Sequence, residues 1–449
     1  DASVTNSKLR IFRKRPGATA EAESKVRHVA VAADRDLTIE LTGRDPSDSA
    51  TKVDGGRVVL DRVELKASSA KLNIRPEATS ATNEALKTTD TRSIVKLGNV
   101  EGSGRVEADC DGSVEIEFDA TTRSTIAATV DRLRTNKCGL SGKVPEGSKI
   151  VVDRDEAVSL PEPRILTVRT ATKADFSKSE IDTRRDASGT AELGDDVKVV
   201  VEASAELLLA DTDVRIPVEL DAGAMIKVAR TDDVVRKLDG VVAGDSVTAD
   251  LVFDRGETVT GSADGAKVEV RSLEAKAGST LRVRQELVTG DTDAEVRVEQ
   301  DIKVGATSRL EFACDGLAKV LMGKADGTRP TATLASDARV LFKKCRVGGF
   351  FPTNFEIKLD DASGEPGARD LRVAETVDFD GSVITTPRDL SGAATSGPEP
   401  RILLETDNIV TLREATLDVT VENADASVTN SKLRIFRKRP GATAEAESK

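Results

Sequence analysis

The sequence has no tryptophan and no tyrosine, and these absences exclude several kinds of protein. Its 449 residues contain 11 phenylalanines, two methionines, four cysteines and one histidine. Aromatic side chains normally supply the large buried areas of β-sandwich cores and of binding sites, so their scarcity predicts a core of small, β-branched side chains. Sites that cleave polysaccharides normally stack sugar rings on tyrosine or tryptophan. Because GxSxG, P-loop and GxGxxG motifs are also missing, we expect no enzyme.

The chain also lacks an excess of positive charge and a long apolar run. Its net charge is −12, with basic and acidic residues interleaved, which argues against a nucleic-acid or anionic-membrane partner. A membrane-spanning helix needs about 18 or more consecutive apolar residues, so we expect no membrane-spanning segment. The basic cluster from Lys8 to Arg15 recurs from Lys432 to Arg439 and is followed by glutamates. We interpret it as a solvated face or as a contact with an acidic neighbouring subunit.

A single histidine and the absence of a CxxC motif leave no metal-ligand set of the usual spacing. The two halves of the chain resemble each other, as described below, and the counterpart of His28 in the second half is Lys237. We therefore interpret His28 as a surface residue. Asp-x-Asp pairs can aim two carboxylates at one calcium ion, but aspartate is also an ordinary turn residue. We therefore expect no cofactor and keep calcium as the alternative at Asp109 and Asp111, Asp211 and Asp213, and Asp291 and Asp293.

The most informative feature that is present is a duplicated segment. Residues 1–25 read DASVTNSKLRIFRKRPGATAEAESK, and residues 425–449 read the same 25 letters. Two segments that share a fold need residues of the same class, not identical residues. A recent tandem duplication, or a copy introduced deliberately, therefore produced this match. The period is 424 residues, the distance from Asp1 to Asp425. We expect the chain to be a window on a longer repetitive polypeptide.

A second, older repeat lies inside this period. Residues 38–69 align without gaps on residues 248–279, and Cys110-Asp111-Gly112 corresponds to Cys314-Asp315-Gly316. Lys137-Cys138 corresponds to Lys344-Cys345, and residues 201–213 align on residues 413–425. The sequence therefore predicts three segments: residues 1–25 as the end of a preceding repeat, residues 26–234 as one β module, and residues 235–449 as a second, homologous module.

Short alternating phrases fill both modules, among them NSKLRIF, RDLTIEL, GSVEIEF and TSRLEF. A turn residue followed by apolar, any, apolar is typical of half-buried strands, so we expect an all-β chain. A parallel β-solenoid, in which like side chains stack between coils, fits this pattern. The alternative is a string of immunoglobulin-like β-sandwiches, which usually carry a buried tryptophan and a tyrosine corner. The lack of both residues favours the solenoid.

The four cysteines form two pairs, Cys110 with Cys138 and Cys314 with Cys345, separated by 28 and 31 residues. That separation is about one long coil, so each pair would lie on adjacent rungs about 4.8 Å apart. Disulfide geometry accepts such a spacing. We expect two disulfides, with buried thiols as the alternative. Disulfides favour an extracellular, cell-surface or periplasmic setting.

These repeated strand and turn phrases resemble the right-handed parallel β-helix repeats of large bacterial surface and fibre proteins. The resemblance covers the whole chain and implies a structural or adhesive role. We expect a fibre-forming extracellular protein whose partner is itself, joined end to end by covalent continuation or by strand donation. The alternative is an adhesin stalk or a cell-surface binding array.

Contacts between repeats are expected in the duplicated segment. The candidate residues are Asp1, Leu9, Ile11 and Phe12 in the first copy, and Leu433, Ile435 and Phe436 in the second. A further candidate is the phenylalanine pair Phe350 and Phe351, which with Pro352 replaces Lys143-Val144-Pro145 of the first module. The pair is a candidate for an exposed contact, and a local plug of the core is the equally open interpretation.

Overall fold

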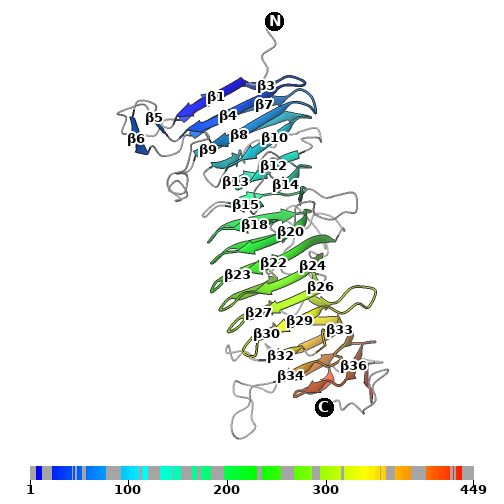
Figure 1. Cartoon of the computed structure of the whole chain (residues 1–449). Helices are drawn as coiled ribbons and strands as arrows, with labels where there is room; N and C mark the ends of the chain where they lie inside the picture. The colour runs from blue at the N-terminus through cyan, green and yellow to red at the C-terminus, as the bar shows by residue number, and fades with distance from the viewer. Residues whose placement is uncertain are drawn as a thin grey trace. The chain divides into compact units, whose positions relative to one another are not determined.

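The structure is a computed structural model in which the described part of the chain is built of β-strands (Figure 1). It describes residues 7–12, 23–42, 44–45, 48–52, 57–76, 93–110, 114–119, 132–144, 146–152, 164–168, 173–183, 197–229, 235–253, 267–285, 294–314, 318–353, 355–359, 370–385, 401–424, 428 and 431–436. The chain divides into two compact units, an N-terminal unit of residues 1–217 and a C-terminal unit of residues 218–449.

The strands of the N-terminal unit are β1 (Ser7–Phe12), β2 (Glu23–Val26), β3 (Val29–Val31), β4 (Asp36–Thr42), β5 (Arg44–Asp45), β6 (Asp48–Lys52), β7 (Arg57–Leu65), β8 (Lys71–Pro76), β9 (Ser93–Gly102), β10 (Arg105–Asp109), β11 (Val114–Phe118), β12 (Arg132–Asn136), β13 (Cys138–Lys143), β14 (Lys149–Val152), β15 (Arg164–Val168), β16 (Lys173–Asp175), β17 (Glu180–Asp182), β18 (Val197–Val201) and β19 (Glu206–Ala210). The boundary between the units falls within β20 (Asp213–Leu220).

The strands of the C-terminal unit are β21 (Met225–Ala229), β22 (Arg236–Ala243), β23 (Thr248–Phe253), β24 (Lys267–Ala275), β25 (Thr280–Gln285), β26 (Glu295–Val304), β27 (Arg309–Ala313), β28 (Lys319–Met322), β29 (Thr331–Leu334), β30 (Arg339–Lys343), β31 (Arg346–Phe350), β32 (Glu356–Lys358), β33 (Leu371–Asp378), β34 (Val383–Thr385), β35 (Arg401–Leu404), β36 (Ile409–Arg413), β37 (Thr416–Leu417), β38 (Thr420–Asn423) and β39 (Lys432–Phe436).

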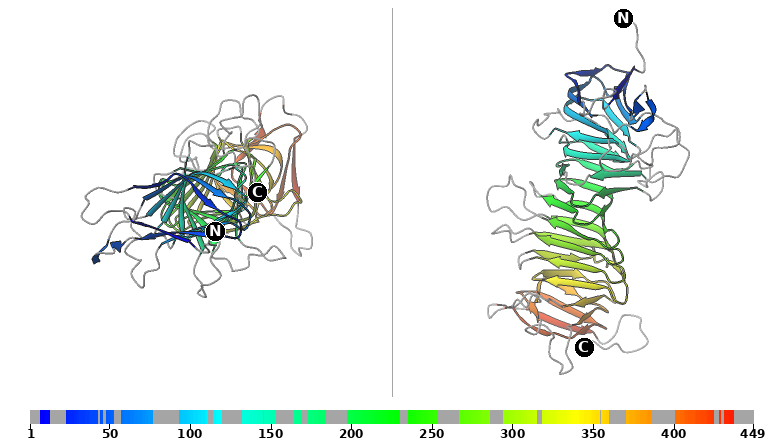
Figure 2. Two further views of the ribbon diagram at one scale, coloured as in Figure 1. Left: turned by 90° about the horizontal axis from the view of Figure 1, so that it is seen from above. Right: turned by 90° about the vertical axis from the view of Figure 1, so that its left-hand side faces the viewer.

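Each unit is a parallel β-solenoid, as the sequence predicts. In the C-terminal unit β23, β25, β27 and β30 pair in parallel, and their first residues follow one another at intervals of 32, 29 and 30 residues. In the N-terminal unit β4, β8, β10 and β12 pair in the same way. Figures 1 and 2 show these strands as successive rungs within each unit. The sandwich alternative is wrong, because the described ladders are parallel apart from the short β5–β6 pair.

Columns of like side chains fill the interior. One column of the C-terminal unit runs through Leu251, Val283, Phe312 and Phe342, which are register partners on β23, β25, β27 and β30. All four are at most 2% exposed. The rings of Phe312 and Phe342 stack with centroids 4.8 Å apart. Successive rungs place their side chains at equivalent inward positions, so small and branched aliphatic groups can pack on one another along a column. This geometry explains the aliphatic composition.

A tight turn recurs at one corner of the coils. Ser279 N donates to Lys276 O at 3.1 Å, which closes a four-residue turn with Gly278 in its third position at a φ of 69°. Ala205 N and Ala224 N close the same kind of turn. Positive φ at the third position marks a type II turn. The fourth residue points into the narrow corner and is small and 1% exposed in all three turns. In these three turns, the small residue that precedes each strand lies at this corner.

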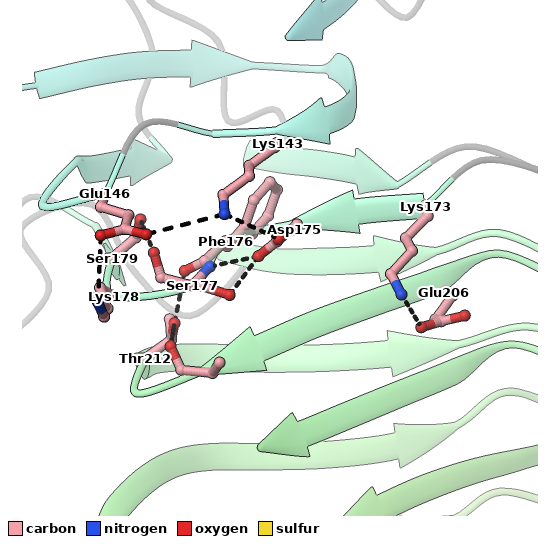
Figure 3. A network of polar contacts seen from close by, with 11 residues as sticks. Lys143, Glu146, Lys173, Asp175, Phe176, Ser177, Lys178, Ser179, Glu206 and Thr212 are labelled. Carbon is pink, nitrogen blue, oxygen red and sulfur yellow. Dashed lines mark hydrogen bonds and ion pairs between the residues drawn. The ribbon is translucent and has the colours of Figure 1, made fainter. Parts of the chain in front are cut away.

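Polar side chains satisfy the backbone at the corners of the N-terminal unit (Figure 3). The carboxylate of Asp175 accepts a hydrogen bond from Ser177 N at 3.0 Å and another from the Ser177 hydroxyl. The hydroxyl of Thr212, one coil further on, donates to the carbonyl of Phe176 at 2.6 Å. Lys143 Nζ, one coil earlier, lies 3.9 Å from Asp175 Oδ2. This corner is thus tied to the coils before and after it.

Corner residues with positive φ recur in both units and correct one part of the sequence alignment. Ser204 and Asp407 have φ of 60° and 61°, and Asp211 and Glu414 both have φ of 53°. The two pairs are each separated by 203 residues. The sequence alignment of residues 201–213 on 413–425 uses a separation of 212 and is therefore wrong by 9 residues. Every coil carries the same alternation, so a displaced alignment still matches apolar with apolar positions.

Candidate assembly site

The duplicated segment occurs twice in the structure, as β1 and as β39. Residues 8–12 and 432–436 share the sequence KLRIF. In the first copy β1 pairs in parallel with β4, a later strand of the N-terminal unit. In the second copy β39 pairs in parallel with β36, an earlier strand of the C-terminal unit. In the described residues neither strand has a second ladder. The two copies therefore show the two different neighbours of one sequence.

The inward positions of this segment match both neighbours. Leu433 is the register partner of Val410, and its twin Leu9 is the partner of Ile39. Val410 and Ile39 are both 0% exposed. Paired residues on parallel strands face the same side of the sheet. A leucine at this position consequently continues an interior column toward either neighbour.

The register two residues further along the segment repeats this match. Ile435 is the register partner of Leu412, and its twin Ile11 is the partner of Leu41. Leu412 is 4% exposed and Leu41 is 2% exposed. The backbone register thus places two alternate positions of one short strand beside buried apolar residues of both neighbours.

Leu433 marks an open end of the column. Of the large apolar side chains in the described residues, it is the only one that is exposed, at 44% of its surface. The register places it beside Val410 on β36, and in the described residues β39 has no second ladder on its other side. An edge strand with unpaired backbone groups and an exposed inward leucine is a surface that can accept another strand.

The outward positions differ in charge between the two neighbours. Arg434 pairs with Thr411, and its twin Arg10 pairs with Glu40. Glu40 is 4% exposed, and its Oε1 lies 3.9 Å from a guanidinium nitrogen of Arg75. The register therefore places this position beside a neutral residue on one strand and an acidic residue on the other.

The structure describes only part of the predicted contact residues. Asp1 lies outside the described residues. The backbone of Leu9, Ile11 and Phe12 lies in β1, and that of Ile435 and Phe436 lies in β39, whereas their side chains are outside the description. Leu433 is the one candidate of this group whose side chain is described.

The prediction that Phe351 is an exposed contact is wrong. Phe351 is 0% exposed, and its ring centroid lies 4.8 Å from that of Phe379 and 6.2 Å from that of Phe342. Phe351 follows the last residue of β31 and fills the core, which agrees with the alternative interpretation of a local core plug. Phe350 is half-buried on the outer side, with the guanidinium of Arg329 at 5.8 Å from its ring centroid. The pair is not a common exposed patch.

Both predicted disulfides are confirmed. Cys110 is bonded to Cys138 and Cys314 to Cys345, with Cα atoms 4.8 Å apart in each bridge. Cys110 follows β10 and Cys138 begins β13, while Cys314 follows β27 and Cys345 precedes β31, so each bridge joins adjacent rungs. A lysine with a φ near 50°, Lys137 or Lys344, precedes the second cysteine in each case. The lysines gave no sequence signal for a left-handed corner, because glycine and asparagine are the usual residues there.

Among the described residues, the candidates for metal binding do not converge. Asp111, Asp291 and Asp293 lie outside the described residues. In the part of the chain that is described, no group of three or more histidine, cysteine, aspartate or glutamate residues is placed to hold a metal ion. The side chain of His28 is 42% exposed, with Nε2 at 3.2 Å from a carboxylate oxygen of Glu64. The described part of the chain contains no helix that is long and apolar enough to cross a membrane.

A polar hollow of about 260 Å³ lies on the outer face of the N-terminal unit. Glu107 is one of the lining residues, with a carboxylate oxygen 4.0 Å from Lys71 Nζ and 3.9 Å from a guanidinium nitrogen of Arg134. The charged side chains that line it are three cations and three carboxylates: Lys71, Arg75, Arg134, Asp36, Glu107 and Asp109. The hollow is therefore neutral overall and has no excess charge to recruit an ion.

Comparison with models of protein families, with curated proteins and with solved structures gives no match to this chain.

Proposed function

We propose that the chain is a structural, fibre-forming protein whose 424-residue periods continue end to end as a parallel β-solenoid. One observation carries this proposal. The same five-residue strand pairs with β36 in one copy and with β4 in the other, so a single copy lying between them would have a complete ladder on both sides. Its inward residues would also be covered on both sides by interior columns.

Burial of the exposed leucine supports end-to-end growth. Covering the remaining 44% of Leu433 would contribute about 1 kcal/mol, since complete burial of a leucine side chain contributes about 1.5–3 kcal/mol. Pairing of the open backbone of β39 adds to this. Each coil of a solenoid contacts mainly its neighbours, so a completed junction is equivalent to any other rung.

The two disulfides support an extracellular or cell-surface location, because such bonds persist in oxidising compartments. They also tie adjacent rungs in each unit, which suits a fibre that has to resist unfolding and proteolysis. The alternative of an adhesin stalk or binding array had one candidate contact, the phenylalanine pair at 350 and 351. Burial of Phe351 removes half of that contact, so the structural role is favoured.

Electron microscopy of the purified chain tests the proposal. We expect unbranched filaments with an axial repeat, and we expect Leu433→Asp to leave particles of one chain. A charged side chain at this inward position would be buried without a partner at the junction. Lys432→Gln is the matched control, since it makes the same change in net charge on the same strand and should leave filaments intact.

Circular dichroism should show that both variants retain the β-sheet signal of the unmutated chain. Discrete particles of one chain's mass for the unmutated protein, over a wide range of concentrations, would refute the fibre proposal.

A further inference from the structure

One side of the C-terminal unit carries an excess of cations. On the parallel ladder of β23, β25, β27 and β30, buried residues alternate with outward ones. The outward charged residues of this ladder are Arg282, Arg284, Arg309, Arg339 and Lys343, with the carboxylates Asp250 and Glu311. We call this side the arginine face. Five cations less two carboxylates give it a net charge of +3, although the whole chain has a net charge of −12.

A second side of the same unit has the opposite sign. It is formed by β29 and by the C-terminal parts of β22, β24 and β26, which pair in parallel. Its outward charged residues are Asp239, Glu274, Glu299 and Asp301, with the cations Arg271 and Lys303. We call this side the acidic face, and two cations less four carboxylates give it a net charge of −2. The tight turn from Lys276 to Ser279 separates the two faces, so they lie on different sides of the coil.

The arginine face has hydrogen-bond donors to offer a partner. Arg282 Nε and Arg284 Nε donate to the two oxygens of Asp250, at 2.6 and 3.0 Å. One carboxylate thus orients two cations. An arginine has five N–H donors, and the other donors of these two have no partner among the described residues. Arg309 and Arg339 are register partners on adjacent strands. Like charges directly opposite each other are destabilising, and carboxylates from a partner would relieve this repulsion.

The acidic face of a second copy has its carboxylates at a matching interval. Glu274 and Asp301 lie on the adjacent strands β24 and β26, as Arg309 and Arg339 lie on the adjacent strands β27 and β30. Adjacent strands are about 4.8 Å apart in any such ladder. Two copies of one solenoid therefore repeat their carboxylates and their arginines at the same interval.

We propose that the arginine face of one copy binds the acidic face of a second copy, so that copies associate side by side. Guanidinium and carboxylate groups suit this contact because they can pair through two parallel hydrogen bonds. Two different faces meet, so the contact is heterologous and each copy can bind a neighbour on either face. Lateral association of this kind goes beyond end-to-end growth and does not depend on it.

Sedimentation of full-length chains measures the lateral contact. Every chain carries Leu433→Asp, which opposes the proposed end-to-end contact, so that lateral association is measured by itself. Three further variants are compared with this parent chain: an arginine-face variant with Arg309→Gln and Arg339→Gln, an acidic-face variant with Glu274→Gln and Asp301→Asn, and a control with Lys237→Gln and Lys267→Gln. The control makes the same change in net charge as the arginine-face variant, but on the N-terminal parts of β22 and β24.

At about 0.15 M salt, where charges interact over about 8 Å, the parent chain and the control should associate equally. Each face variant alone should associate about tenfold more weakly, because exposed ion pairs contribute little individually and each variant loses two charged groups. An equimolar mixture of the two face variants should recover mixed dimers, since each variant supplies the face that the other lacks. At about 1 M salt, where the screening length is about 3 Å, the parent chain should also associate at least tenfold more weakly.

Several results would overturn the proposal. Weaker association of the arginine-face variant without recovery in the mixture would mean that the arginine face meets some other surface. An equal loss in the control would show a general effect of net charge. Unchanged association in both face variants, or no association of the parent chain, would also contradict it. In the last case, binding of polygalacturonate that the arginine-face variant loses would assign the arginine face to an acidic polysaccharide. Each of these results leaves the fibre proposal standing, because Leu433→Asp is present throughout.

Discussion

Removal of one disulfide is expected to destabilise its own unit and leave the other unit unchanged. The perturbation is the double substitution Cys110→Ala with Cys138→Ala, and separately Cys314→Ala with Cys345→Ala. The bridges close chain segments of 28 and 31 residues. In the chain-entropy model, closing segments of these lengths stabilises by about 3.6 and about 3.7 kcal/mol. The two variants should therefore lose nearly equal free energies of unfolding, which makes each a matched control for the other.

The assay has to avoid intrinsic fluorescence, because the chain has no tryptophan or tyrosine. Urea unfolding followed by far-ultraviolet circular dichroism gives the loss in stability. Hydrogen exchange then identifies the unit. In the first variant we expect amides of β10, β12 and β13 to exchange on the order of 400-fold faster, since about 1.4 kcal/mol corresponds to a factor of ten. Amides of β27, β30 and β31 should keep their rates, because the coils of a solenoid contact mainly their neighbours.

Two results would refute this reasoning. An unchanged urea midpoint in either variant would mean that loop closure contributes nothing to the native state. Equal acceleration of exchange in both units would mean that the solenoid unfolds as a single block rather than by local groups of coils. Reduction of the unmutated chain should reproduce the sum of the two effects, with four thiols appearing for the four cysteines.

Two more substitutions test close packing and a buried charge. Gly142 and Gly147 have nearly the same φ, 79° and 80°, but a Cβ on Gly142 would lie 1.9 Å from the carbonyl oxygen of Phe118, whereas one on Gly147 would meet nothing within 4 Å. In urea unfolding, we expect Gly147→Ala to lower the free energy of unfolding by about 1 kcal/mol, and Gly142→Ala to lower it by at least about 2 kcal/mol more. Equal losses in the two variants would contradict the packing argument. Arg329→Met should lower the free energy of unfolding by about 3 kcal/mol, because the carboxylate of Asp378, which is 7% exposed, would lose a partner at 2.6 Å. Arg329→Lys should restore only part of this loss, since the guanidinium also donates to two main-chain carbonyls, and complete recovery would show that charge alone matters.

The fold and the disulfides could be predicted from the sequence because both depend on periodicity. Alternation of apolar residues gave the strands, and the shortage of aromatic residues favoured stacked coils over sandwiches. The cysteine separations are close to the length of one coil, so the bridges between adjacent rungs followed from spacing. The strand pairing of the duplicated segment could be predicted only in part. The sequence showed that the segment recurs, but the opposite pairing of its two copies required the register.

The errors of sequence reasoning have physical causes. The alignment of residues 201–213 was displaced because every coil repeats the same alternation. Of the two corner residues that fix it, Asp211 and Glu414, the glutamate is not a usual residue for a positive φ. The placement of Phe351 failed because two adjacent phenylalanines face opposite ways at the end of a strand. Sequence alone shows neither which of the two points inward nor where the strand ends.

The duplicated segment has to fit two different neighbours, and this requirement restricts its sequence. Position 434, which is position 10 in the first copy, meets Thr411 on one side and Glu40 on the other. An acidic residue there would repel Glu40, and an apolar one would lie on the outward face.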